Sequence, residues 1–396
     1  MMGKTVVLGV TGGIAAYKAL DIVSRLRKRD IDVHVIMTEH AREFVTPLSF
    51  QSLSSNMVIY DMFEEPRAFE IQHISLAKKA DVILVAPATA NIIGKIANGI
   101  ADDMLSTTIM ATKSEVIFAP AMNTNMYENP ILQNNIEKLK KYGYKFIEPD
   151  SGRLACGDVG KGKLADVDDI CEIVESALYN NKDLVGKRVL VSAGPTISKI
   201  DPVRYITNNS SGKMGYEIAK EARDRGAKVT LVSGPTNLKA PLGIDVINVS
   251  TNEEMKDAIM DRYDEFNIIV MSAAVADYKP KHYSDKKIKK GNEDLVIEFK
   301  RDSDILKLLG EVKKENILVG FAAESNDLLE NARGKLIKKN LDFIVANDIS
   351  TNEYGFKSDF NKVTIMSRDG NELVLDKMTK REVAKNLFDT ILKKSL

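Results

Sequence analysis

The sequence predicts an α/β protein with two domains, each built on a mostly parallel sheet covered by helices. The first observation is an apolar segment, Lys4–Val10, that runs into the glycine turn Thr11–Gly13 and then into a helical pattern. A strand, a small-residue turn and a helix in this order are typical of the start of a nucleotide-binding layer. The second observation is that this pattern begins again at Arg188–Ser192, followed by the turn Ala193–Pro195. The third is the length of 396 residues, which suits two domains of about 150–200 residues each.

The two domains are expected to meet near residue 182. A polar, charged run, Asn180–Lys187, separates the last helical pattern of the first half from the second opening. We therefore place the domains at residues 1–182 and 183–396. Neither glycine turn is a complete G-x-G-x-x-G motif, so each alone is a weak signal. The repetition is what indicates two domains, each with its own site.

Strands and helices alternate through the first half, which predicts a parallel sheet with helices on both faces. A helix is expected at Ala15–Arg29, where apolar residues recur at helical spacing, and another at Val167–Leu178. The predicted strands are Thr5–Val10, Asp32–Met37, Asp81–Ala86 and Glu115–Phe118.

The same alternation in the second half predicts a second three-layer domain. Near its end, Arg368–Asn371 is expected to turn a β-hairpin that precedes a final helix. The predicted helices before that hairpin are Lys213–Arg225 and Asn252–Tyr263. The predicted strands are Arg188–Ser192, Lys228–Ser233, Asp245–Val249, Asn267–Met271, Ile317–Phe321, Asp342–Ala346, Asn361–Ser367 and Glu372–Leu375.

Composition argues against several classes of function. Lys+Arg and Asp+Glu both number 56, so no net positive charge favours nucleic acid or an anionic membrane as a partner. The longest apolar runs, such as Ile268–Ala276, are far shorter than the roughly 20 residues of a membrane span. No signal peptide is visible, and the two cysteines, Cys156 and Cys171, fit a reducing cytoplasm. With four histidines in the chain, a histidine-rich metal site is not expected.

Small, hydroxyl and amide residues follow each predicted strand of the first half. Because ligands of open parallel sheets bind at the carboxyl ends of the strands, these residues are candidates for a ligand cleft. One such turn would be an ordinary turn, but four in register favour a cleft. The residues concerned are Thr11–Gly13, Thr38 and Glu39, Pro87–Asn91 and Pro120–Asn123, to which Ser106 and Thr107 add further hydroxyl groups.

Three residues of the first half could take part in chemistry. His73 precedes the third predicted strand, although a lone histidine is more often structural than catalytic. Asn123 lies between two methionines that could belong to a core. Cys156 lies in a glycine-rich segment, where a thiol is a better candidate for reactivity than Cys171, which we expect to pack within a helix.

Taken together, these motifs resemble the flavin-dependent cysteine decarboxylases, and most closely the phosphopantothenoylcysteine decarboxylases. The resemblance implies a flavodoxin-like fold, FMN in the cleft, and trimers or dodecamers with FMN at subunit contacts. Tyr127 stands where the family often has tryptophan, and the aromatic ring is kept. The residues that carry the resemblance are Thr11–Lys18, His73, Pro87–Asn91, Pro120–Tyr127 and Ala155–Asp158.

The resemblance implies a redox-assisted decarboxylation in which the flavin oxidises a cysteinyl thiol and later returns the hydride. By the same resemblance His73 is the base, Asn123 holds the substrate carboxylate, and Cys156 donates a proton to the enethiol. The residues implied to bind FMN are Gly12, Gly13, Thr38, Thr89, Ser106, Thr107 and Met122.

Two clusters of polar and charged residues in the second half are not needed to form a sheet. Asp201–Gly215 gathers asparagines, serines, Arg204 and Lys213 at a predicted helix start, as an anion site requires. The lysine run Lys286–Lys290 would usually be a solvated face. With Asp277 before it, and with two lysines at positions 335 and 339 on one helix face, a triphosphate site with Mg²⁺ becomes competitive.

The second half resembles the phosphopantothenate–cysteine ligases, which in many bacteria are fused behind the decarboxylase. The motifs that carry this resemblance are Gly194–Thr196, Asp201–Asn208, Ser210–Gly215, Ala273–Tyr278, Lys287–Lys290, Gly320–Glu324 and Ala346–Asp348. Asp302-Ser303-Asp304 stands where relatives often have Asn-Pro-Asp. The two resemblances together cover essentially the whole chain, in the fused order.

This second resemblance implies that CTP and Mg²⁺ activate the phosphopantothenate carboxylate as an acyl-cytidylate, from which cysteine displaces CMP. Asn208 and Arg204 would serve the acyl-cytidylate step, Lys287 would contact the triphosphate, and Asp277 is the candidate ligand of Mg²⁺. Dodecamers built from decarboxylase trimers and ligase dimers are expected. The residues expected to line the CTP site are Ser272, Ala273, Asp277, Lys287, Ser303, Asp304, Ile305, Leu306, Phe321, Lys335 and Lys339.

We therefore expect a bifunctional enzyme that makes 4′-phosphopantetheine from phosphopantothenate, L-cysteine and CTP. A flavin-binding scaffold that has lost activity would be expected to lack His73, Asn123 or Cys156, and all three are present. A decarboxylase of peptide cysteines would not need the ligase half. An NAD-dependent dehydrogenase is disfavoured because neither opening has the full glycine motif with a downstream ribose-binding acid.

Overall fold

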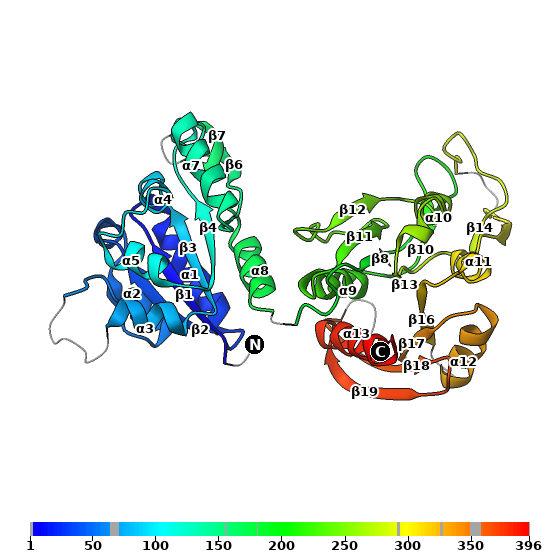
Figure 1. Ribbon diagram of the computed structural model, residues 1–396. Helices are drawn as coiled ribbons and strands as arrows, with labels where there is room; N and C mark the ends of the chain where they lie inside the picture. Colours follow the sequence, from blue (N-terminus) through cyan, green and yellow to red (C-terminus); the bar gives the residue numbers. More distant parts are fainter. Residues whose placement is uncertain are drawn as a thin grey trace. The chain divides into compact units, whose positions relative to one another are not determined.

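The computed structural model describes residues 3–63, 71–154, 157–179, 181–290, 294–324, 328–348 and 358–395. The chain folds into two compact units, Met1–Asn180 and Asn181–Leu396, and each is described by itself. Both are α/β layers with a central sheet (Figure 1). Cys156, the predicted proton donor, lies outside the described residues. In the described part of the chain, no helix has the length and apolarity of a membrane span.

The first unit has a five-stranded parallel sheet in the order β2-β1-β3-β4-β5. Its central strands are buried on both faces, which explains why they read as continuous apolar runs rather than as alternating patterns. The strands are β1 (Thr5–Val10), β2 (Asp32–Met37), β3 (Val82–Ala88), β4 (Glu115–Pro120) and β5 (Lys145–Phe146). An antiparallel hairpin, β6 (Asp150–Arg153) and β7 (Val159–Lys163), follows the sheet.

Helices cover both faces of this sheet and form two apolar cores (Figure 1). One core contains α1 and α8, and the other contains α3, α4, α5 and α7. The helices are η1 (Ile14–Tyr17), α1 (Lys18–Arg27), η2 (Glu39–Glu43), α2 (Pro47–Ser54), α3 (Gln72–Lys79), α4 (Ala90–Ala97), α5 (Met104–Ala111), α6 (Thr124–Tyr127), α7 (Pro130–Lys141) and α8 (Val167–Ala177).

The helix predicted at Ala15–Arg29 differs from the observed one at its start. Its first turn, η1, is a 3₁₀ turn in which the Ala16 amide donates to the Gly13 carbonyl at 2.9 Å. Gly13 is the residue before this turn and has no side chain to cap a free amide. The tighter i→i+3 bond pairs that amide instead, and α1 begins only at Lys18.

The second unit has an eight-stranded sheet in the order β12-β11-β8-β13-β16-β17-β18-β19. The first six strands are parallel, and β18 and β19 are added antiparallel at one edge. The strands are β8 (Arg188–Ala193), β11 (Lys228–Ser233), β12 (Asp245–Asn248), β13 (Ile268–Met271), β16 (Ile317–Glu324), β17 (Phe343–Asp348), β18 (Phe360–Ser367) and β19 (Glu372–Thr379).

Two groups of helices cover opposite faces of this sheet. The face that we call the α9 face carries α9 (Lys213–Asp224) and α13 (Lys380–Ser395). The face that we call the α12 face carries α10 (Asn252–Met260), α11 (Ile305–Val312) and α12 (Leu328–Lys338), with η3 (Tyr263–Glu265) after α10.

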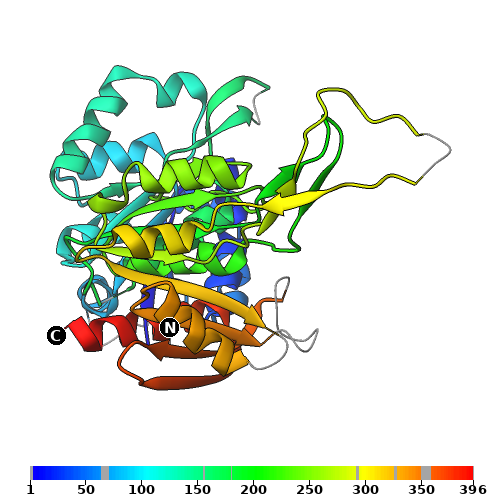
Figure 2. The ribbon, with the colours of Figure 1, turned by 90° about the vertical axis from the view of Figure 1, so that its right-hand side faces the viewer.

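Two short hairpins extend from the second unit side by side, and we call them the arm (Figure 2, green and yellow). The Ser198 hydroxyl donates to the Tyr278 carbonyl at 3.2 Å, and the Ser284 amide donates to the Ile200 carbonyl at 3.1 Å. These bonds hold the hairpins together. The arm consists of β9 (Ile197–Lys199) with β10 (Tyr205–Thr207), and of β14 (Tyr278–Pro280) with β15 (Phe299–Arg301) and the described residues between them.

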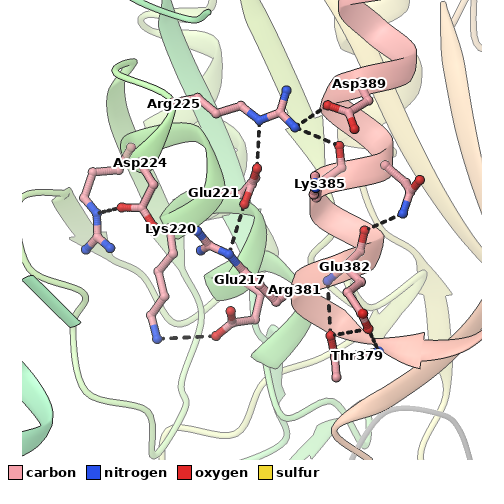
Figure 3. Close-up of polar contacts among 12 residues, drawn as sticks. Glu217, Lys220, Glu221, Asp224, Arg225, Thr379, Arg381, Glu382, Lys385 and Asp389 are labelled. Atoms are coloured by element: carbon pink, nitrogen blue, oxygen red, sulfur yellow. Dashed lines mark hydrogen bonds and ion pairs between the residues drawn. The ribbon is translucent and has the colours of Figure 1, made fainter. Parts of the chain in front are cut away.

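A buried network of ion pairs fastens α13 to α9 (Figure 3). The Arg225 side chain is 1% exposed, and its Nε donates to Glu221 Oε1 at 2.7 Å, while its other nitrogens contact Asp389 and Asp183. Arg381, on α13, pairs with Glu221 at 3.0 Å. A buried charge is tolerated only with such compensation, so the network fixes how the two helices align.

Replacing Arg225 by methionine should destabilise the second unit by about 3–5 kcal/mol, because the buried Glu221 and its neighbours would lose a cation. Hydrogen exchange of the full chain, followed by mass spectrometry, should show faster exchange in peptides of α9 and α13 and no change in the first unit. The matched control is Arg333→Met, because the exposed Arg333–Glu372 pair should contribute under about 1 kcal/mol. Equal exchange in the two variants would contradict a stabilising role for the network.

Candidate functional site

The first unit has a cavity of about 450 Å³ at the carboxyl edge of its sheet. Its walls come from the residues that follow three parallel strands: Gly12–Ala15 after β1, Thr89 and Ala90 after β3, and Ala121–Asn123 after β4. Residues of the β6–β7 hairpin complete the lining. This is the edge at which parallel sheets bind ligands.

The turn after β1 packs closely against His40, which is possible because Gly12 has no side chain. A Cβ on Gly12 would lie 2.4 Å from the Cβ of His40 and 2.9 Å from its carbonyl carbon, whereas one on Gly13 would meet only Thr89 Cγ2, at 3.8 Å. Thr11 joins neighbouring turns, since its hydroxyl donates to the Pro87 carbonyl at 2.7 Å and accepts from the Thr89 amide at 3.1 Å.

Asn123 lies at the cavity wall and begins α6. Its Oδ1 accepts from the Asn125 amide at 2.8 Å, and its Nδ2 donates to Asp158 Oδ2 at 2.7 Å. The neighbouring Met122 amide donates to the Gly162 carbonyl at 2.9 Å, so strand β7 lies directly against this turn. The backbone and Asp158 therefore hold the Asn123 amide in place.

Tyr127 and Lys161 fasten the same hairpin to α6 through Glu148. The Tyr127 hydroxyl and Lys161 Nζ both donate to Glu148 Oε2 at 2.8 Å. Burial of the phenol, together with the carboxylate beside it, raises the pKa of Tyr127 above its ordinary value. Burial opposes ionisation of Glu148 as well, but Lys161 and Tyr127 outweigh it and lower the pKa of that carboxyl.

Five of the residues predicted for the first site line this cavity: Gly12, Gly13, Thr89, Met122 and Asn123. Within the described residues, Thr38, His73, Ser106 and Thr107 are not part of its lining.

Ser106 is absent from the lining because it is fully buried at the start of α5. Its hydroxyl and amide form hydrogen bonds with Asp103 in a capping box there. Thr38 follows β2 at the same edge, and His73 lies half-buried on α3. Sequence reasoning missed Arg153 and Lys163 and gave no role to Lys18 of the motif Thr11–Lys18; all three bring positive charge to the cavity wall.

The second unit has a cavity of about 390 Å³ at the carboxyl edge of its own sheet. It brings together most of the residues predicted for the second site, from five separate stretches of chain. These are Asn208, Ser272, Ala273, Asp277, Ser303, Asp304, Ile305, Leu306, Phe321, Lys335 and Lys339.

Asn208 joins two of these stretches, because its Nδ2 donates to the carbonyls of Ala274 and Val275, each at 3.0 Å. Asp304 caps α11 by accepting from the Lys307 amide at 3.0 Å, and its carboxylate also pairs with Lys339 at 2.8 Å. The Lys339 ammonium is therefore held at the cavity wall on the α12 face.

Two predicted residues, Arg204 and Lys287, lie on or beside the arm and are not among the described residues that line this cavity. The Arg204 guanidinium donates to the Ile288 carbonyl and lies 3.5 Å from Asp201. Asp277 is exposed at the cavity. The described residues contain no group of three or more His, Cys, Asp and Glu side chains suited to a metal ion.

Sequence reasoning missed Asn361 and Lys380 of this cavity, and it gave no role to Asn347, although it quoted the motif Ala346–Asp348. Lys380 is 4% exposed, and its Nζ lies 3.0 Å from Asn361 Oδ1. Burial, together with the charge of Lys213, lowers the pKa of Lys380 to about 8. In the sequence, Lys380 is one of several charged residues at the start of a helix, where lysine usually faces solvent.

Comparison with known proteins divides the chain into the same two parts. Residues 1–179 match the family model described as flavoprotein, and residues 184–395 match the one described as DNA/pantothenate metabolism flavoprotein C-terminal domain. A solved structure described as the C-terminal domain of the coenzyme A biosynthesis bifunctional protein CoaBC is 44% identical. It covers 54% of this chain and 96% of that one, with a TM-score of 0.47.

Full-length relatives carry the same two parts. The coenzyme A biosynthesis bifunctional protein CoaBC of Bacillus subtilis is 49% identical over 391 residues, which are 98% of this chain and 96% of the relative. The protein of that name from Borreliella burgdorferi is 46% identical over 97% of this chain and 98% of the relative. The chain therefore belongs to the family of coenzyme A biosynthesis bifunctional proteins, with a flavoprotein segment followed by a DNA/pantothenate metabolism flavoprotein C-terminal domain.

Proposed function

We propose that this bifunctional enzyme of coenzyme A biosynthesis works in two steps, one in each unit. In the second unit, CTP activates the carboxylate of 4′-phosphopantothenate as an acyl-cytidylate, and the amine of L-cysteine displaces CMP. In the first unit, FMN assists decarboxylation of the resulting 4′-phosphopantothenoylcysteine to 4′-phosphopantetheine. The observation that carries the ligase step is that eleven residues predicted for it, from separate parts of the sequence, line one cavity.

For the ligase step, the cavity offers donors and cations on the side where phosphate charge would develop. Lys335 and Lys339 lie at the wall beside the N-terminus of α11 and suit a triphosphate. Asp277 suits Mg²⁺, because magnesium is commonly held by one or two carboxylates together with substrate phosphates. The Asn208 amide, fixed by two backbone carbonyls, would support the loop against which the acyl-cytidylate forms.

Arg204 and Lys287 remain proposed residues of the same step. Both residues belong to the arm region. They can therefore act in this step only if the arm reaches a cavity that holds the nucleotide. The arm also carries exposed apolar side chains, among them Tyr205, Tyr278 and Phe299. Exposed apolar groups gathered in one place favour an interface, which supports the proposal of ligase dimers within a cytoplasmic dodecamer that also contains decarboxylase trimers.

The first cavity fits FMN. Ala121 and Met122 give an apolar wall for a ring, and Lys18 and Lys163 bring positive charge for a phosphate. Gly12, at the same wall, lets its turn pack closely against His40. When bound, FMN supplies two-electron redox chemistry that the side chains lack. Asn123 would orient the substrate carboxylate at this wall. His73 as base and Cys156 as proton donor are the remaining proposed roles.

The function itself is tested by a visible absorbance spectrum of the purified protein, recorded before and after addition of phosphopantothenate, L-cysteine, CTP and Mg²⁺. We expect a flavin spectrum and joint release of CMP, pyrophosphate and carbon dioxide. A flavin spectrum without CMP release would contradict the ligase step. A colourless protein that takes up no added FMN would contradict the decarboxylase step.

Replacing Gly12 by alanine should weaken FMN binding at least tenfold, because the new methyl group would overlap His40 and displace the turn that faces the cavity. Fluorescence titration of the apoprotein with FMN measures this. Gly13→Ala is the matched control, since its methyl group would only touch Thr89. Equal FMN affinity in both variants would rule out the close approach at Gly12 as a requirement.

Replacing Asn208 by aspartate should slow CMP release roughly 100-fold. The reason is that the variant loses the donor to two carbonyls and places a negative charge against them. Rapid quench followed by mass spectrometry should show that acyl-cytidylate accumulates. Asn209→Asp puts the same charge at the next cavity residue and serves as the control. Normal turnover of Asn208→Asp would remove this residue from the mechanism.

A further inference from the structure

The second cavity has positive side chains on two sides, and the nucleotide accounts for only one of them. Lys335 and Lys339 approach from the α12 face, whose core contains α10, α11 and α12. Lys213 and Lys380 approach from the α9 face, where α9 and α13 begin. The ligase reaction has two phosphorylated reactants, so a second cationic side requires an explanation.

Lys380 is an unusual residue for a cavity wall because its side chain is almost completely buried. Its Nζ donates to the carbonyl of Ser358 and to Asn361 Oδ1, which are neutral acceptors. Among the described residues, the charged groups that act on it are Lys213 on α9, which disfavours the ammonium form, and Asp359 before β18, which favours it. Asp359 is 75% exposed and pairs with Lys213 at 2.6 Å, so its compensation of the buried ammonium is weakened by solvent.

Two asparagines lie on the same side of the sheet as Lys380. Strand alternation places Asn347 of β17 with Phe343 and Val345, whose side chains belong to the α9 face, and Asn361 of β18 with Val363 in the same way. Asn347 is 8% exposed and lines the cavity, and its Oδ1 has no hydrogen-bond partner among the residues that the structure describes.

A buried amide oxygen without a partner costs free energy. Such a group at a cavity wall is available to a donor from a ligand. Asn361 already has partners, because its Oδ1 accepts from Lys380 and its Nδ2 contacts Met214 Sδ at 3.6 Å. The α9 side of the cavity therefore combines cations for an anion with one acceptor for a hydroxyl or an amide N–H.

We propose that Lys380 and Lys213 bind the terminal phosphate of the acyl substrate, and that Asn347 accepts a hydrogen bond from the chain joining that phosphate to the reacting carboxylate. This assignment rests on the proposed ligase function of the second unit. It brings the phosphate in from the α9 face and the nucleotide in from the α12 face, with the carboxylate between them. The two phosphorylated groups then bind at separate cations and need not compete for one site.

The assignment predicts how binding depends on pH. Lys380 has a pKa of about 8, so it is charged below that pH and neutral above it. A phosphate dianion beside it stabilises the ammonium and raises its pKa. Affinity for the phosphorylated substrate should therefore be fully present below pH 8 and fall as the pH rises past it. At pH 8, binding should take up about half a proton, because a group at its pKa is half protonated.

The first experiment measures KM for phosphopantothenate, for pantothenate without its phosphate and for CTP in the full-length enzyme. Lys380→Ala should raise KM for phosphopantothenate roughly 10–100-fold, as expected for a lost charge-assisted hydrogen bond, and change the other two less than twofold. Lys380→Arg should restore most of the affinity, which also guards against a variant that simply misfolds. Lys220→Ala, on the same α9 but paired with Glu217, is the control.

The Asn347→Leu variant tests the second part of the proposal, the hydrogen bond to Asn347, by itself. It should raise KM for phosphopantothenate and pantothenate by the same factor, because the acceptor contacts the shared chain and not the phosphate. A larger effect of Lys380→Ala on CTP than on phosphopantothenate would assign the lysine to the nucleotide and overturn the proposal. Equal effects of Lys380→Ala on KM for pantothenate and for phosphopantothenate would overturn it as well.

The second experiment is calorimetric titration of the protein with phosphopantothenate at pH 8 in two buffers of different ionisation enthalpy. The unmodified enzyme should take up about half a proton on binding, and Lys380→Arg should take up none, because guanidinium does not titrate there. Absence of proton uptake by the unmodified enzyme would overturn the proposal. If the enzyme forms no CMP from CTP at all, the ligase function fails, while this binding measurement still decides the role of Lys380.

Discussion

Both units depend on one constraint, which is that parallel strands all end at the same edge of a sheet. Strands such as β1, β3, β8 and β13 are buried on both faces, so they have no room for polar functional groups along their length. Such groups can stand only where the strands stop. Because the strands are parallel, those positions are neighbours in space even when they are far apart in sequence. The two candidate sites described above are formed in that way.

The second unit extends this arrangement with two antiparallel strands. Since β18 runs opposite to β17, its first residues lie beside the last residues of β17, as the pairing of Asn347 with Val363 shows. Strand β19 then returns to the same edge and places Lys380 there, at the start of α13. The ion pairs of Arg225 and Arg381 hold α13 against α9, so they also fix Lys380 relative to the start of α9.

This constraint explains what the sequence could predict. The longer strands of both sheets followed from the hydrophobic pattern, whereas the short strands β5, β6, β7, β9, β10, β14 and β15 did not. Residues placed after the longer strands, such as Gly12, Asn123 and Ser272, line the cavities. Residues whose position depends on tertiary contacts could not be found. The arm carries Arg204 away from the cavity lining, and Lys380 reaches the edge because the β18–β19 hairpin pairs with β17 and returns there. Ser106 differs for a local reason, because its hydroxyl is used by a capping box.

The two buried cations of the second unit illustrate two different uses of charge. Arg225 is surrounded by the carboxylates of Glu221, Asp389 and Asp183, so its charge is compensated within the fold and it serves to join helices. Lys380 donates to neutral oxygens and lies near another lysine, and its pKa falls in consequence. A site that keeps its cation under-compensated gives up stability that an arriving anion can restore. The contrast supports a structural role for Arg225 and a ligand-binding role for Lys380.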